Sequence, residues 1–284
     1  MKKIKYIVAL TVVVSLLAGG IAQAEDMAAA KKIFSEKQDS VIWVLGVAKM
    51  SFSAPDSKGS PANIPDEEVK VEAMATLVQT NGLAVTVLSQ LDPARAMNGR
   101  SLRTSRGPVK VDAVSSLKEI KVVMADGTEI PADLVLKDTD LDLAVIRIKA
   151  ASKEAKGITF PAVDLKNSAT AEMLDPVVSI TRMDEVFNRV ANVLPGHVNM
   201  ITKTPRVFLR ASGATGGCPT FNIDGKLIGI TAGRLVKGHQ PSAAIIPAAD
   251  VLEIVEQAAN AKPILPEDTK PAAPKANEPI DLDK

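Results

Sequence analysis

Short apolar runs separated by tight-turn signals recur along most of this chain. Asn81-Gly82, Asp126-Gly127 and Asp224-Gly225 each lie between two apolar runs, and such dipeptides favour two-residue β-hairpins. Turn signals about every ten residues, with helices only near the two ends, predict an all-β barrel or sandwich. The predicted helices are 25–38 and 248–261. The span between them is long enough for two small barrels, 39–150 and 151–261, with a junction near 150–157.

Two segments interrupt this regular pattern. The polar segment 92–109 carries four arginines and little periodicity, so we expect a long loop. Residues 187–204 are expected to form a strand pair bent at Pro195-Gly196.

The two ends of the chain have the composition of processing and tail segments. A basic start, the apolar run 6–17 and the motif Ala22-Gln23-Ala24 predict a secretory signal peptide over 1–24. No later stretch is long and apolar enough to cross a bilayer. We therefore expect export to the periplasm or cell envelope, without a membrane span after cleavage. The Pro-rich, charged segment 262–284 predicts a disordered tail.

Composition excludes several function classes. The net charge is only +1 and aromatic residues make up 3%, so nucleic-acid binding has little support. Cys218 is the single cysteine, which excludes an internal disulfide framework. The chain contains two histidines and no cluster with metal-ligand spacing, so no metal and no cofactor are predicted.

The most informative stretch is 208–230, FLRASGATGGCPTFNIDGKLIGI. Its turn, 213–217, is rich in glycine, which allows positive φ and lets successive N–H groups point into one concavity. Serine peptidases stabilise an oxyanion with backbone donors of this kind beside the nucleophile. The alternative interpretation is a glycine-rich surface hairpin.

Three stretches together resemble the trypsin-like peptidase domain of the HtrA/Deg family. ATLVQTNGLAVTVLSQL (75–91) is similar to the strand pair that ends in T-x-A-H-V, and ADGTEIPADLVLKDTDLDLAVIRI (125–148) to the block that ends in D-L-A-V-L-x-I. Residues 213–230 are similar to G-N-S-G-G-P-L-x-N-x-D-G-x-V-I-G-I. The resemblance covers about 39–260, without a PDZ-like segment. It implies an all-β fold of two Greek-key β-barrels, the trypsin-like (chymotrypsin) fold, with a short N-terminal helix and a C-terminal helix.

The resemblance assigns the triad residue by residue. The acid falls on Asp142 and is retained, the general-base histidine falls on Ser89, and the nucleophile falls on Thr215. A serine hydroxyl cannot replace imidazole as a base near neutral pH. A threonine hydroxyl needs an adjacent base to act as a nucleophile. The oxyanion-hole-like donors would be the N–H groups of Gly213 and Thr215.

Five further residues enter the interpretation. Leu209 and Arg210 are candidates for the specificity pocket. Cys218 is an alternative nucleophile, although it stands three positions after the expected site. His197 and His239 are interpreted as surface or loop histidines, since neither lies in a motif that would supply the missing base.

These assignments lead to three hypotheses on function. The leading one is a catalytically inactive, secreted pseudoprotease that binds extended peptides or unfolded envelope proteins, with 192–201 as an edge for β-augmentation. The alternative is an active endopeptidase that uses Thr215 or Cys218 with a non-standard base. A purely structural envelope module is the third. Because the family often forms trimers, the resemblance also makes a homo-oligomer a candidate state.

Overall fold

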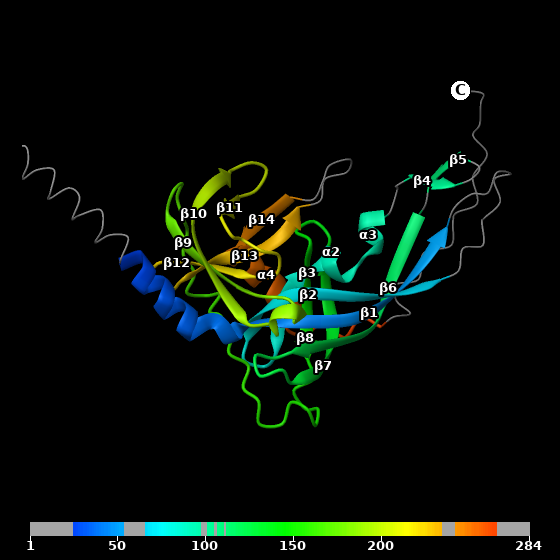
Figure 1. Cartoon of the computed structure of the whole chain (residues 1–284), viewed down its shortest axis with the longest axis horizontal. Helices are drawn as coiled ribbons and strands as arrows, with labels where there is room; N and C mark the ends of the chain where they lie inside the picture. Colours follow the sequence, from blue (N-terminus) through cyan, green and yellow to red (C-terminus); the bar gives the residue numbers. More distant parts are fainter. Residues whose placement is uncertain are drawn as a thin grey trace, which may run out of the picture.

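Two closed antiparallel β-barrels, each of six strands, form the body of this computed structural model. The structure describes residues 25–53, 66–97, 101–104, 107–110, 112–234 and 242–265. Figure 1 shows the two barrels side by side, with a helix at each end of the described chain. The predicted all-β double-barrel fold is confirmed. The predicted signal peptide lies outside the described residues, and no helix among those described is long and apolar enough to cross a membrane.

The first barrel is built from β1 to β3 and β6 to β8. Its strand order is β1-β2-β3-β8-β7-β6, and β6 closes the barrel on β1. The bounds are β1 Val41–Ser53, β2 Glu67–Gln79, β3 Leu83–Val87, β6 Asp112–Val123, β7 Glu129–Asp138 and β8 Leu143–Ile148. Along β8, Ala144 and Ile146 line the barrel interior, whereas Leu143 and Val145 pack toward the second barrel. This strand is buried on both faces, which explains its nearly continuous apolar sequence.

The second barrel contains β9 to β14 in the order β10-β11-β14-β13-β12-β9. The bounds are β9 Pro176–Arg182, β10 Ala191–Thr202, β11 Phe208–Ala211, β12 Pro219–Asn222, β13 Leu227–Arg234 and β14 Ser242–Pro247. The largest apolar cluster joins residues of both barrels, among them Leu83, Val145, Ile180 and Phe221. The hydrophobic effect therefore holds the two barrels together.

Arg182 adds polar contacts between the barrels. Its guanidinium donates to the main-chain carbonyls of Val41 and Gln38 and lies 3.7 Å from Asp39 Oδ1. Trp43 contributes another link, since its indole N–H donates to the Met183 carbonyl at 3.1 Å. The start of β1 is thus tied to the end of β9.

Helices occupy only the ends and the connections. Residues 25–37 are helical and lead into η1 (Gln38–Ser40), while η2 (Glu185–Phe187) lies between β9 and β10. The C-terminal helix α4 (Ala248–Ala258) buries Val251, Ile254 and Val255 against the largest cluster. Arg147 of β8 donates to the carbonyls of Ala258 and residues 259 and 261, at 2.8 to 3.0 Å. This satisfies carbonyls at a helix end that has no intrahelical donors.

Two expectations about the connections were wrong. Segment 92–109 contains the short helix α3 (Ala94–Met97) and the strands β4 (Ser101–Thr104) and β5 (Gly107–Lys110), which pair with each other. Their short polar strands carry no apolar periodicity that would predict them. Residues 191–202 form the single strand β10, which runs through Pro195-Gly196 without a turn. Over 191–197 this strand pairs with β9 alone, and proline is tolerated where its nitrogen faces away from the partner.

The chain after α4 continues along the first barrel. The Ile264 N–H donates to the Leu134 carbonyl at 2.7 Å, and the Ile264 side chain packs against the first barrel's core. Residues 262–265 of the predicted disordered tail are thus held by the barrel. The rest of that tail, 266–284, lies outside the described residues.

Candidate functional site

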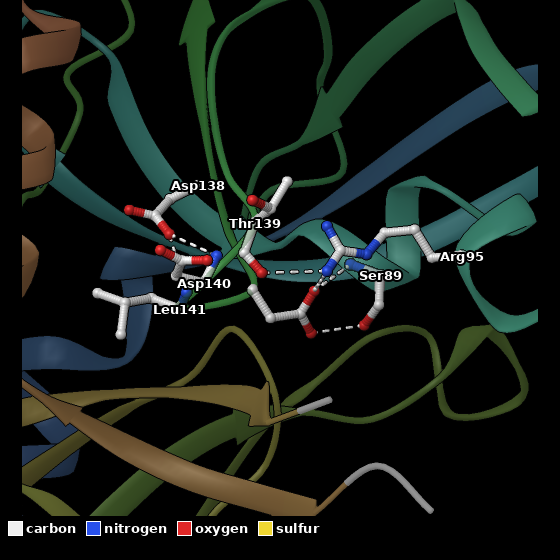
Figure 2. Close-up of polar contacts among 7 residues, drawn as sticks. Ser89, Arg95, Asp138, Thr139, Asp140 and Leu141 are labelled. Carbon is white, nitrogen blue, oxygen red and sulfur yellow. Dashed lines mark hydrogen bonds and ion pairs between the residues drawn. The ribbon is translucent and has the colours of Figure 1, made fainter. Parts of the chain in front are cut away.

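A polar turn between β7 and β8 positions the carboxylate of Asp142. Asp138 Oδ1 accepts hydrogen bonds from the N–H groups of Asp140 and Leu141, at 2.9 and 2.8 Å (Figure 2). An Asp side chain that bonds N–H groups two and three residues later closes a local turn. Asp142 then adopts a left-handed φ of 56°, which directs the chain into β8. The D-T-D-L-D sequence therefore builds the support of the predicted acid locally.

Ser89 binds this carboxylate with both its main chain and its side chain. The Ser89 N–H donates to Asp142 Oδ1 at 2.9 Å, and the Ser89 hydroxyl donates to Oδ2 at 2.6 Å. Ser89 lies in α2 (Leu88–Leu91), directly after β3. The structure thus brings together the two residues at the predicted acid and base positions. The Ser89 hydroxyl uses Oδ2 of Asp142 as its hydrogen-bond acceptor.

Gly233 closes the other side of the carboxylate. Its N–H donates to Asp142, and an ideal Cβ on Gly233 would lie 2.6 Å from Asp142 Oδ2. No side chain fits in that space. Gly233 is therefore required by the close approach of β13 to the acid.

Burial determines the electrostatics of Asp142, whose exposure is 1%. Desolvation raises the pKa of this carboxyl group above its ordinary value, and the hydrogen bond from Ser89 and the charge of Arg95 oppose that rise. Arg95 Nη2 lies 3.9 Å from Asp142 Oδ1 and donates to the Thr139 carbonyl at 3.2 Å (Figure 2). Arg95 was not among the sequence candidates, because its short helix carries no motif.

The turn 213–217 is anchored to both barrels. The Gly217 N–H donates to the Thr231 carbonyl of β13 at 2.8 Å. Thr76 of β2 donates its hydroxyl to the Gly217 carbonyl at 2.8 Å. Gly217 has a φ of 78°, and an ideal Cβ there would lie 1.9 Å from the Met74 carbonyl oxygen. Only glycine fits, which explains one glycine of the motif.

Thr215 projects from this turn and is half-buried. Its hydroxyl donates within the turn to the Gly213 carbonyl at 3.3 Å. Among the described residues, neither Ser89 nor Asp142 forms a hydrogen bond with it. The N–H groups of Gly213 and Thr215 donate to no acceptor in the described part of the chain, so both predicted oxyanion donors are available to a ligand.

Gln90 connects the turn to the helix that carries Ser89. An ideal Cβ on Gly216 would lie 3.3 Å from Gln90 Nε2 and 3.1 Å from Val87 Cγ2. The exposed amide of Gln90 therefore lies against the turn beside Thr215. A carboxamide has no basic nitrogen, so Gln90 cannot act as a general base.

Cys218 lies in the protein core. It is 1% exposed, and its Sγ is 3.5 Å from Met74 Sδ. Burial raises the pKa of the Cys218 thiol well above its ordinary value. A buried, protonated thiol cannot attack a bound peptide, so the geometry argues against Cys218 as the alternative nucleophile.

The two specificity-pocket candidates point to opposite faces of β11. Leu209 is buried against Ile228 and Ile245. Arg210 is exposed and lines a cavity of about 450 Å³ with Ser212, Gly213 and other residues: Asn199, Met200, Ala211, Ala214 and Ala243. Because side chains alternate along a strand, only Arg210 reaches the cavity beside the turn. Leu209 instead lines a separate cavity of about 170 Å³ with Val207 and Ile228, so its role in a specificity pocket stays a prediction.

His197 lies on another face of the second barrel. It is exposed on β10 and lines a separate cavity of about 180 Å³ with Asp26, Met27 and Ile223. Within the described residues it forms no hydrogen bond with Thr215 or Cys218. His239 lies outside the described residues. Among those described, no group of three or more His, Cys, Asp or Glu residues has the arrangement of a metal site.

The expected peptide-binding edge at 192–201 has one strand partner along each part of its length. β10 pairs with β9 over 191–197 and with β11 over 198–202. The Ser212 N–H also donates to the His197 carbonyl at 3.3 Å. Apart from that bond, the side of 191–197 opposite β9 has no strand partner among the described residues, so this segment stays a candidate edge for β-augmentation.

The model of the trypsin-like peptidase domain matches residues 76–230. This chain belongs to the trypsin-like peptidase domain family. The matched range contains Ser89, Asp142 and Thr215. The solved protease domain of MamO from Magnetospirillum magneticum, in its apo form, is 18% identical. That comparison covers 78% of this chain and 97% of the MamO chain, with a TM-score of 0.46. The search of curated proteins found no match.

Proposed function

We propose that this trypsin-like domain is an exported, catalytically inactive pseudoprotease that binds extended peptide segments. The observation that carries the proposal is the 2.6 Å hydrogen bond from the Ser89 hydroxyl to Asp142. In an active triad this carboxylate orients an imidazole, which takes the proton of the nucleophile. Here it holds a hydroxyl that is not basic at neutral pH.

Retained binding features support a role other than hydrolysis. The turn 213–217 keeps two backbone donors beside a cavity, and that cavity contains the cation Arg210. Such groups donate hydrogen bonds to a carbonyl or carboxylate oxygen of a ligand whether or not a bond is broken. Export is supported by the signal-like pattern of 1–24, and it predicts a periplasmic product that lacks those residues.

The test compares purified protein that lacks residues 1–24 with its Thr215→Ala variant and with an active trypsin-like peptidase. Fluorophosphonate labelling and hydrolysis of fluorescent casein are both measured. We expect labelling and turnover at the level of Thr215→Ala. Turnover that is lost in Thr215→Ala would overturn the proposal in favour of an endopeptidase with a non-standard base. Mass spectrometry of labelled peptides would then locate the nucleophile.

A further inference from the structure

The cavity beside the turn 213–217 has one charged side chain among its lining residues, the guanidinium of Arg210. Its other polar groups are the side chains of Asn199 and Ser212. Among the described residues, no Asp or Glu lines the cavity and none forms an ion pair with Arg210. The positive charge at this site is therefore not neutralised by the described part of the chain.

Backbone groups at the cavity add to the same polarity. Gly213 lies in the cavity wall and Thr215 follows two residues later, outside the lining; neither N–H has an acceptor among the described residues. The guanidinium of Arg210, with Gly213 in the same cavity wall, complements an anion with planar oxygens, which Arg binds through paired hydrogen bonds. A volume of about 450 Å³ lies in the range of small-ligand sites and accommodates one peptide side chain.

We infer that this cavity binds a carboxylate presented by a peptide, either an acidic side chain or a free C-terminus. The inference rests on the proposed peptide-binding function and names its ligand class. Leu209 cannot contribute, because it faces the core. Arg210 is the residue that selects for negative charge. Its exposure makes the preference sensitive to salt.

The experiment uses three peptides, titrated into ¹⁵N-labelled protein without residues 1–24 and followed by NMR. They are acetyl-Ala-Ala-Ala-Glu-Ala-Ala-amide, its Gln counterpart, and acetyl-Ala-Ala-Ala-Gln with a free C-terminus. We expect the Glu peptide, the free-acid peptide or both to bind about tenfold more tightly than the neutral peptide, the effect of one charge-assisted contact. The peptide that is preferred identifies the source of the carboxylate.

Arg210→Met should abolish the preference, and Arg210→Lys should retain part of it. The matched control is Arg206→Met, which removes the same charge from an exposed arginine outside the cavity lining. Loss of preference in both Met variants would overturn the assignment to Arg210 in favour of net charge.

The outcomes separate this inference from the proposed function. Equal affinity for charged and neutral peptides would overturn the inference and leave peptide binding intact. Binding of none of the peptides would overturn both. Cleavage of a bound peptide, detected by mass spectrometry, would overturn only the proposed inactivity.

Discussion

Replacement of Ser89 by Ala tests whether the hydroxyl binds an ionised Asp142. The substitution removes the 2.6 Å hydrogen bond to Oδ2 and keeps the 2.9 Å bond from the main-chain N–H to Oδ1. Asp142 is 1% exposed, so water cannot readily replace the lost donor. The change therefore isolates one hydrogen bond to a buried carboxylate.

The expected loss depends on the charge of Asp142. A hydrogen bond to a charged group stabilises a protein by about 1.5–3 kcal/mol, and one between neutral groups by about 0.5–1.5 kcal/mol. At neutral pH we expect the free energy of unfolding to fall by the larger amount, and at a pH where the group is protonated by the smaller. The difference, about 1–1.5 kcal/mol, means that removal of the hydroxyl raises the pKa of Asp142 further.

The sign of the pH dependence follows from the direction of the pKa shift. Burial raises the pKa of Asp142 in the folded state above its value of about 3.9 in the unfolded state. Between those two values the folded state binds more protons, so the contribution of Asp142 to stability decreases as pH rises. Removal of the Ser89 hydroxyl raises the folded pKa further. The pH range over which stability decreases therefore becomes wider in the variant, and the total decrease in the free energy of unfolding becomes larger.

Urea unfolding of parent and variant at several pH values between 4 and 8 measures this difference. NMR titration of the Asp142 carboxyl carbon reports the pKa itself. Ser35→Ala is the control, because its hydroxyl donates to the uncharged Lys32 carbonyl at an exposed site and should give a pH-independent change. An equal loss at every pH, with an unmoved Asp142 titration, would refute the assignment of the Ser89 hydroxyl to an ionised Asp142.

Four further predictions follow from single contacts. Cys218 should react with iodoacetamide only after unfolding, since its thiol is buried with a raised pKa; rapid labelling of native protein would contradict this. Thr231→Val should increase the free energy of unfolding by about 1 kcal/mol, measured as a higher melting temperature, because the buried hydroxyl of Thr231 has no partner among the described residues. Arg147→Met should decrease the free energy of unfolding by about 1.5–3 kcal/mol, measured as a lower urea midpoint, because the last carbonyls of α4 lose their donors. An unchanged midpoint would show that these contacts do not stabilise the fold. Ser89→His/Thr215→Ser should hydrolyse casein at least about 100-fold faster than the parent, a fraction of the roughly 10⁶-fold that triad members supply, whereas Ser89→His/Thr215→Ala should not.

The unexpected features of the site are long-range contacts. The sequence indicated Asp142 and Ser89 only through resemblance, and their hydrogen bonds connect residues 53 positions apart. Arg95 and Gln90 were missed, because both lie in short segments without periodicity. Gly233 was missed because its role depends on the approach of β13 to Asp142.

The sequence by itself indicated most of the strands of the two barrels, and its resemblance to the family predicted Ser89 and Thr215 at the positions of the catalytic histidine and serine. Alternating apolar residues and Asp-Gly or Asn-Gly turns are local signals, so they can be read without a fold. Only the tertiary structure decided that Cys218 is buried and that Arg210 rather than Leu209 faces the cavity. It also showed that the Ser89 hydroxyl donates a hydrogen bond to the Asp142 carboxylate. These features depend on which strand face turns inward when the barrels close and pack together, and that choice arises from contacts between segments far apart in the chain.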